Sequence, residues 1–236
     1  MSGEEKTLCK SPSHILFLIT STINPCKAGL SYTSVRSVFT WKQRLDQTLQ
    51  TIASINERMK SEQHTYKILC VDNSESLDKH VRMSLLANGC DGFEHCYDIS
   101  TNSQYKALGE SSNTVSAIKY LDAIVDKKFP FDFVFKLSGR YQIHKTFPLP
   151  FFMNDQKMVF HSRDNTVTTV LYCIPRSLLK EWKHIVQTIA AGKSGAGSTT
   201  GYETQMLYET KPYVIYHTGP LGAEGLVSVD GSLWKI

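Results

Sequence analysis

Polar side chains follow three apolar stretches of this sequence, at the points where those stretches end. The three groups are Thr20-Ser21-Thr22, Asp72-Asn73-Ser74 and Ser138-Gly139-Arg140. A carboxylate such as that of Asp72 accepts hydrogen bonds from the hydroxyls of a sugar or from the N–H of a nucleobase. The guanidinium of Arg140 can hold a diphosphate through two parallel hydrogen bonds. These residue types therefore suit a ligand that carries both hydroxyl and phosphate groups.

The elements that would carry these groups alternate along the chain. Apolar runs predict strands at 15–19, 66–71, 94–99, 131–137, 158–161, 168–174 and 213–216. Apolar residues at helical spacing and turn signals predict helices over 35–60, 76–88, 113–127, 176–190 and 204–208. This alternation favours an α/β fold, with a mostly parallel central sheet and helices on both faces. Since ligands bind beyond the carboxyl ends of parallel strands, we expect the three polar groups to meet along one edge.

Composition limits the class of protein. The chain has 236 residues, 41% of them hydrophobic, and we expect one domain over 13–236 behind a flexible N-terminus at 1–12. A net charge of +4 without a basic run disfavours nucleic acid as a partner. The cysteines form no C-x-x-C pair, so we expect reduced thiols and no zinc site. The apolar run 14–20 is too short for a signal peptide or a membrane span, which predicts a cytoplasmic protein.

Three common α/β chemistries lack their motifs. No G-x-G-x-x-G follows the first predicted strand, so a dinucleotide fingerprint is missing. The sequence contains no G-x-x-x-x-G-K-[ST] loop for a nucleoside triphosphate and no G-x-S-x-G elbow for a hydrolase serine.

An ordered set of short motifs resembles another group of α/β proteins. The set comprises Ile19–Asn24, R-x-x-Q-T-x-x-T-I-x-S-I from Arg44 to Ile55, V-D-N-S at 71–74, K-x-x-G-E-x-x-N from Lys106 to Asn113, K-L-S-G-R-Y at 136–141, Gly201-Tyr202-Glu203 and L-G-A-E-G at 221–225. Over residues 14–230 it is similar to GT-A glycosyltransferases, in particular to a small group from bacteria and large DNA viruses. The resemblance implies a single GT-A-like domain that transfers a sugar from a UDP-, GDP- or TDP-linked donor to a glycan or small hydroxyl acceptor. For a viral member, the cytoplasm would be that of the host.

The resemblance also implies roles for particular residues. Asp72, with Asn73, would hold the ribose or base of the donor, and the first loop, Thr20 to Asn24 with Ser21 and Thr22, would flank the nucleotide. Arg44, Lys106, Gly109 and Asn113 fall in motifs of the same donor site, the last three at a loop-to-helix entry where a helix N-terminus favours anions. Glu203 matches a late carboxylate that would act as general base in an inverting displacement, with Glu209 and Glu224 as competitors. The loop 193–200 would close over both substrates.

The sequence departs from the family at one informative place. Most GT-A enzymes carry an Asp-x-Asp motif that holds Mn²⁺ or Mg²⁺ where this chain has Ser138-Gly139-Arg140. We therefore assign no metal ligand and leave metal dependence open, with Arg140 or Lys136 as the alternative source of positive charge. His217, which can complete a metal shell in relatives, is expected to contact phosphate or to be structural.

Two other functions stay open from the sequence. The missing Asp-x-Asp motif is compatible with a catalytically silent GT-A-like module that binds nucleotide or carbohydrate. A nucleotidyltransferase would need a first loop rich in Gly and in Lys or Arg, which the segment Thr20 to Asn24 is not.

Overall fold

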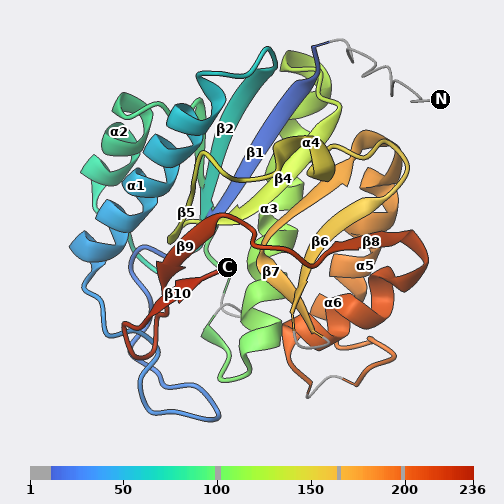
Figure 1. Ribbon diagram of the computed structural model, residues 1–236. Coiled ribbons are helices and arrows are strands. Elements are labelled where there is room, and N and C mark those ends of the chain that lie inside the picture. The colour runs from blue at the N-terminus through green and yellow to red at the C-terminus, as the bar shows by residue number, and fades with distance from the viewer. Residues whose placement is uncertain (1–11, 99–101, 164–165, 198–199) are drawn as a thin grey trace, which may run out of the picture.

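The computed structural model describes residues 12–98, 102–163, 166–197 and 200–236. The expected flexible N-terminus lies outside these residues, except for Pro12. A seven-stranded sheet forms the centre of the molecule, with the strand order β3-β2-β1-β4-β7-β6-β8 (Figure 1). Its strands are β1 (His14–Ser21), β2 (Thr65–Asp72), β3 (Gly92–His95), β4 (Phe133–Ser138), β6 (Met158–Arg163), β7 (Thr166–Pro175) and β8 (Val214–His217). Only β7 runs against the others, so the predicted mostly parallel sheet is confirmed.

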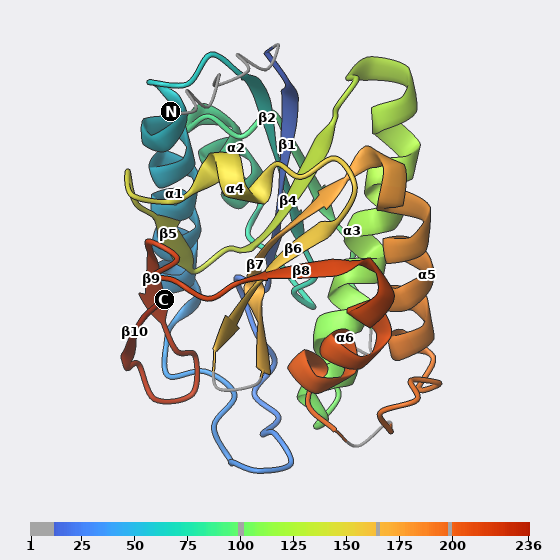
Figure 2. The ribbon, with the colours of Figure 1, turned by 45° about the vertical axis from the view of Figure 1, so that its right-hand side comes forward.

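Alternate residues of the strands face two separate hydrophobic cores. From β1, Ile15, Phe17 and Ile19 pack in the first core, and Leu16 and Leu18 pack in the second. The first core is covered by α1 (Trp41–Met59), α2 (Lys79–Ala87) and α4 (Leu149–Phe152), and the second by α3 (Lys106–Lys128), α5 (Leu179–Ala190) and α6 (Tyr202–Thr210) (Figure 2). Short 3-10 turns at Arg176–Leu178 and Lys211–Tyr213 precede α5 and β8. The prediction of helices on both faces is confirmed.

The starts of α1 and α3 differ most from the predicted ones. Helix α1 begins at Trp41 rather than near residue 35, because Thr40 forms a capping box with Gln43. The Thr40 hydroxyl accepts from the Gln43 N–H at 3.3 Å, and Gln43 Oε1 accepts from the Thr40 N–H at 2.9 Å. Helix α3 begins at Lys106, so Gly109 and Asn113 lie in its first two turns and not in a loop before it. Strand β3 is also shorter and earlier than expected, because it pairs with β2 only from Leu69 to Asp72.

A second, three-stranded antiparallel sheet was not predicted. It consists of β5 (Tyr141–Ile143), β9 (Ala223–Leu226) and β10 (Leu233–Lys235), in the order β10-β9-β5. Strand β5 lies against α1, where Ser54 Oγ accepts from the Ile143 N–H at 3.1 Å. This sheet places the end of the chain in front of the carboxyl end of the central sheet (Figure 1). No helix in the described part of the chain is long and apolar enough to cross a membrane.

Candidate functional site

The carboxyl ends of β1, β2 and β4 meet at one edge of the central sheet. In the register of the sheet, Thr20 lies beside Ser138 and Ser21 lies beside Asp72. The tight turn after β4 is held to β1 and α1, since Gly139 N donates to the Thr20 oxygen at 3.0 Å and the Thr48 hydroxyl donates to the Gly139 oxygen at 2.9 Å. The three polar groups of the sequence therefore come together.

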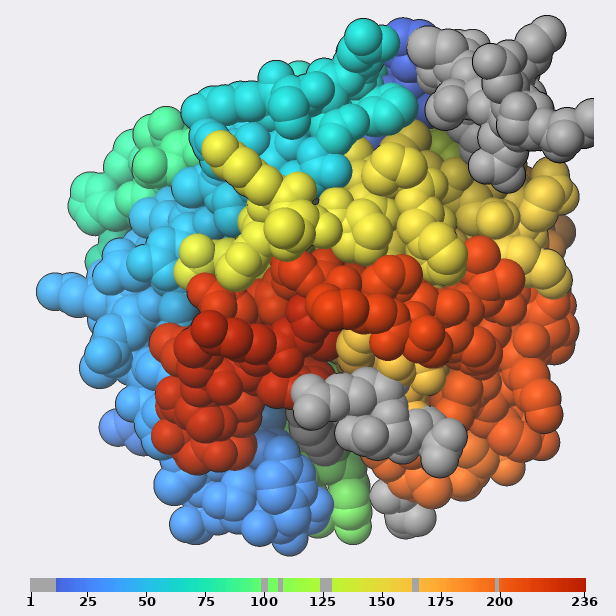
Figure 3. Space-filling view, in the orientation of Figure 1, coloured from blue at the N-terminus to red at the C-terminus, as the bar shows by residue number. Residues whose placement is uncertain are grey.

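Two contiguous cavities open at this edge. The polar cavity, of about 160 Å³, is rich in hydroxyls and is lined by Thr20, Ser21, Thr22, Arg44, Thr48, Glu110, Asn113, Lys136, Ser138, Gly139, Arg140, Tyr141, Thr169, Val170, Glu203 and Trp234. The loop cavity, of about 300 Å³, is bordered by the segment 22–36 and by residues 227–229. Both cavities share a wall formed by Thr22, Arg44, Glu110, Asn113, Arg140, Tyr141, Glu203 and Trp234. Figure 3 shows the C-terminal segment lying across the front of the molecule, between the N-terminal segments and α6.

Most of the predicted site residues line one or both cavities. Ten of the fifteen line the polar cavity, namely Thr20, Ser21, Thr22, Arg44, Asn113, Lys136, Ser138, Gly139, Arg140 and Glu203. Asn73 and Gly109 line the loop cavity instead. The side chain of Lys106 lies outside the described residues. Asp72 and His217 line neither cavity.

Asp72 is fully buried beneath the polar strand ends. Its Oδ2 accepts from the Ser21 hydroxyl at 2.6 Å and from the Ile23 N–H at 2.7 Å, and its Oδ1 accepts from the Ser74 N–H at 2.9 Å. Because both oxygens are used inside the protein, these contacts favour a positioning role for Asp72 over the expected direct contact with ribose or base, which stays a prediction. Asn73, whose Oδ1 accepts from the Thr22 hydroxyl at 2.7 Å, is the residue of this group that reaches a cavity.

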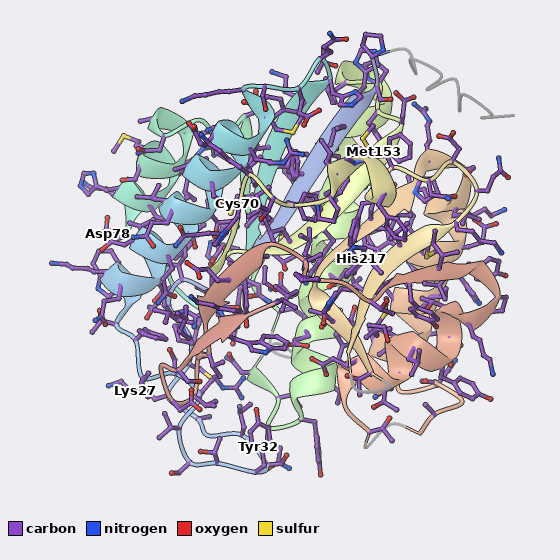
Figure 4. The ribbon with its side chains drawn as sticks, viewed as in Figure 1. Lys27, Tyr32, Cys70, Asp78, Met153 and His217 are labelled. Atoms are coloured by element: carbon purple, nitrogen blue, oxygen red, sulfur yellow. The ribbon has the colours of Figure 1, made fainter. Side chains whose placement is uncertain are left out.

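Replacing Asp72 with Asn is expected to lower the free energy of unfolding by about 1–3 kcal/mol, the cost of a buried group left without its hydrogen bond. In either orientation, the amide nitrogen would face a backbone N–H, of Ile23 or of Ser74. Urea unfolding measures the change. Asp78→Asn is the matched control, because Asp78 is an exposed cap of α2 (Figure 4) and Asn caps helices about equally well. Equal stability of the two variants would contradict the positioning role.

His217 packs among aromatic side chains at the end of β8. Its ring centroid lies 5.0 Å from that of Phe151 and 5.7 Å from that of Phe152 (Figure 4). Burial lowers the pKa of His217. Its Nδ1 is buried with no hydrogen-bond partner among the described residues. These contacts favour the structural one of the two expected roles for His217, and that role stays a prediction.

Two arginines form the positive part of the shared wall. Arg44, only 7% exposed, donates from Nε to the Thr22 oxygen at 2.6 Å and from Nη1 to the Ser228 hydroxyl at 2.9 Å. Arg140 donates from Nη1 to the Leu226 oxygen at 2.8 Å. Burial and then the charge of Arg140 lower the pKa of Arg44 to about 9, with a partial offset from Asp72. Neither arginine forms an ion pair with a carboxylate in the described part of the chain, so the wall can accept an anion.

Two carboxylates and a lysine also line the polar cavity. The buried Lys136 donates to the Thr169 oxygen at 3.0 Å, and Glu203 Oε1 accepts from the Thr169 hydroxyl at 3.4 Å. Glu110 lines the same cavity from α3. Burial is the main cause that raises the pKa of Tyr172, and the charge of Glu110 adds to it. Lys136 Nζ lies 5.7 Å from the centre of the same Tyr172 ring.

The sequence analysis missed several of these residues. Glu110 and Thr48 stand inside two of the quoted motifs, so the motifs themselves could have identified them. Tyr141 likewise ends the quoted motif at 136–141, whereas Trp234 had no such signal, because it lies in no motif and meets Tyr141 only through the second sheet. The two competitors of Glu203 do not line either cavity. Glu209 accepts from the Ser194 hydroxyl and the Gly195 N–H, while Glu224 lies on β9, 3.6 Å from His144 and 3.9 Å from Lys235.

The end of β4 does not fit a divalent cation. A hydroxyl, a glycine and a guanidinium stand where the Asp-x-Asp carboxylates would be, and a second guanidinium, that of Arg44, faces the same cavity. Across the described residues, no group of three or more His, Cys, Asp or Glu side chains is arranged to hold a metal ion.

The fold defines a class that other solved structures share. The chain has a GT-A-like α/β fold, and it superposes on galactosyltransferase LgtC in complex with donor and acceptor sugar analogs with a TM-score of 0.50 at 9% identity, over 86% of this chain and 72% of that one. An active-site mutant of LgtC gives 0.51 at 10% identity over the same shares. A glycosyltransferase involved in glycosylation of the major capsid of PBCV-1 gives 0.46 at 10% identity, over 88% and 82% of the two chains. No protein-family model and no curated protein matches the sequence.

Proposed function

We propose that this protein is a glycosyltransferase that moves a sugar from a nucleotide-diphosphate sugar to a hydroxyl acceptor. The observation that carries the proposal is that two guanidinium groups and two carboxylates line the wall shared by the two cavities. Arg44 and Arg140 stand there without a carboxylate partner in the described chain, and Glu110 and Glu203 line the same wall. LgtC, which has the same fold, was crystallised with donor and acceptor sugar analogs, and this supports the same class of ligands here.

The presence of both signs of charge at one wall suits the changes in charge during glycosyl transfer. As the bond from the anomeric carbon to the diphosphate oxygen breaks, its electron pair leaves with the diphosphate and the sugar ring becomes positive. Guanidinium groups placed at the leaving oxygen stabilise the growing negative charge. Carboxylates at the same wall stabilise the positive ring and can take a proton from the attacking hydroxyl. Glu203 is our choice for this base, which implies a single displacement with inversion.

The cavities differ in ways that suit the two ends of the donor. The loop cavity is partly apolar, with Pro25, Leu30, Tyr32 and Val229 among its lining residues, and we assign the nucleoside to it. Asn73 and Thr22 lie there to meet the polar edges of base and ribose. The hydroxyl-rich polar cavity receives the donor sugar, and the diphosphate bridges the two at the arginines. In this arrangement the side chains of Arg44 and Arg140 supply the positive charge at the diphosphate. The effect of a divalent metal ion is measured in the same binding experiment.

Thermal shift against UDP-, GDP- and TDP-sugars, each with and without Mn²⁺ or Mg²⁺, tests the proposal. A ligand at 100 times its Kd stabilises a protein by about 2.7 kcal/mol, which is easily detected in such a measurement. We expect one nucleotide class to raise Tm and its donor sugar to be hydrolysed slowly. Binding without any hydrolysis or transfer would indicate the silent module, and no shift with any nucleotide would contradict the donor site.

A further inference from the structure

A row of three residues crosses the second sheet at the rim of the polar cavity. Tyr141 of β5 is paired with Gly225 of β9, and Gly225 is paired with Trp234 of β10. Directly opposed residues of antiparallel strands project to the same face. Tyr141 and Trp234 therefore stand on one face with a glycine between them.

The glycine lets the two aromatic rings meet. A Cβ atom at Gly225 would lie 2.5 Å from Cδ1 of Tyr141 and 2.4 Å from the Arg140 oxygen, so any larger residue would displace the Tyr141 ring. The rings of Tyr141 and Trp234 make an edge-to-face contact, with centroids 6.1 Å apart and planes at 78°. Tyr141 is only 4% exposed and supports the partly exposed Trp234 from beneath.

Trp234 is held firmly although it lies near the end of the sequence. Ile236 N donates to the Ala223 oxygen at 2.8 Å, which closes the β9–β10 pair beyond Trp234. On the other side of the pair, Val227 N donates to the Ser232 oxygen at 2.8 Å. Among the described residues, none accepts a hydrogen bond from the Trp234 indole, so its N–H is available to a ligand.

The surroundings of Trp234 indicate what its ring receives. Tyr141 and Trp234 are the aromatic residues among those that line the polar cavity, whose other lining residues are polar or charged apart from Gly139 and Val170. A pyranose ring has this same division, with C–H groups on its faces and hydroxyls around its edge. The C–H face gains dispersion energy against an indole, while the edge hydroxyls reach polar groups.

We propose that Trp234, supported by Tyr141, is the stacking platform for the sugar ring of a saccharide acceptor. The inference rests on the proposed function, because it takes the donor diphosphate to lie at Arg44 and Arg140. A ring seated on Trp234 lies at the shared wall, where its hydroxyl faces both Glu203 and the donor sugar. Trp234 lines the loop cavity as well, but Pro25, Leu30 and Val229 give the nucleobase an apolar wall of its own there. The acceptor class is thus a glycan rather than a peptide or lipid hydroxyl.

Tryptophan fluorescence can report on this platform directly. The chain has three tryptophans, of which Trp182 is fully buried in the second core and Trp41 is exposed at the start of α1. In a Trp41→Phe background, Trp234 is the only partly exposed indole. Methyl glycosides of glucose, galactose and mannose are titrated with and without saturating UDP, GDP or TDP. We expect at least one glycoside to change the emission in a saturable way.

Trp234→Leu is then compared with Trp41→Phe by ligand-observed NMR and calorimetry. We expect Trp234→Leu to weaken glycoside binding by about tenfold or more, which corresponds to 1.4 kcal/mol, and Trp234→Phe to weaken it less. The Kd for the nucleoside diphosphate should change by less than about twofold in all three variants. Circular dichroism confirms that each variant is folded.

Three outcomes would overturn the inference. They are equal glycoside affinity in Trp234→Leu and the wild type, a loss of nucleotide affinity as large as the loss of glycoside affinity, and no glycoside binding to the wild type. The second outcome would mean that the Trp234 ring contacts the nucleotide instead of the acceptor. If instead no nucleoside diphosphate binds the wild type, the proposed function fails on its own, and the glycoside titrations without nucleotide still decide the role of Trp234.

Discussion

Glu203→Gln is expected to lower kcat for sugar transfer by about 10²–10⁴, the usual contribution of a general base. Glutamine has the shape of glutamate but cannot take the proton of the acceptor hydroxyl. The Thr169 hydroxyl, which donates to Glu203 at 3.4 Å, can still donate to the amide oxygen, so the local structure should persist. Transfer is measured by release of the nucleoside diphosphate in the presence and absence of acceptor, together with the Kd of that diphosphate.

Two further variants decide whether the effect belongs to Glu203. Glu209→Gln is the matched control on the same helix, because Glu209 holds the Ser194 turn and lines neither cavity. It should keep the wild-type rate. Glu110→Gln tests the other carboxylate of the polar cavity. The general base is the residue whose replacement removes the fall in kcat/KM at low pH. If Glu203→Gln keeps full turnover and Glu110→Gln removes that fall, the base is Glu110 on α3.

Arg140→Ala is expected to weaken binding of the nucleoside diphosphate by about 30-fold or more, since loss of one partner of a close charge pair costs roughly 2–5 kcal/mol. Arg140→Lys keeps the charge but not the two parallel hydrogen bonds, and should fall between alanine and the wild type. The nucleoside without phosphates is the internal control, because its affinity should not change. Calorimetry with both ligands separates a lost phosphate contact from a general disturbance of the site. Equal loss for both ligands would refute the diphosphate role.

The pH dependence of the same binding reaction tests Arg44. Its pKa is lowered to about 9, so the guanidinium is charged at neutral pH and loses its charge as the pH rises through that value. Affinity for the diphosphate should therefore be constant near neutral pH and should fall as the pH rises through about 9. Arg44→Gln should bind more weakly and lose this alkaline fall. Arg140→Ala should move the fall to higher pH, because the charge of Arg140 is one cause of the shift. A flat profile in the wild type across this alkaline range would exclude Arg44 as the group that titrates.

Local sequence determined the central sheet and the edge where the cavities open. Continuous apolar runs such as Ile15–Ile19 can be satisfied only where both faces of a strand are covered, which requires helices on two sides. The polar residues that end these runs must then lie at the same edge, because β1, β2 and β4 are parallel. Thr20 and Arg140 could be placed near one another for this reason, before any distance was known.

Which of those polar residues face a ligand was decided by tertiary structure. Asp72 and Asn73 are neighbours in sequence, yet Asp72 turns inward to three donors, and Asn73 reaches the loop cavity. Glu110 enters the polar cavity from within α3, because that helix starts at Lys106 and not at Asn113. A strand-end carboxylate looks the same in sequence whether it binds a ligand or its own backbone.

The contact between Tyr141 and Trp234 could not be predicted from the sequence, because it exists only in the folded protein. Strands β5 and β10 have three residues each, too few for an alternating pattern to be recognised, and Tyr141 and Trp234 are far apart in the sequence. Their rings meet because Gly225 leaves room between them, and that requirement exists only once three strands are paired. The periodicity of apolar residues in the sequence determines the helices and strands, because their pattern is local and repeated. Contacts between short segments that are distant in sequence are determined by tertiary packing.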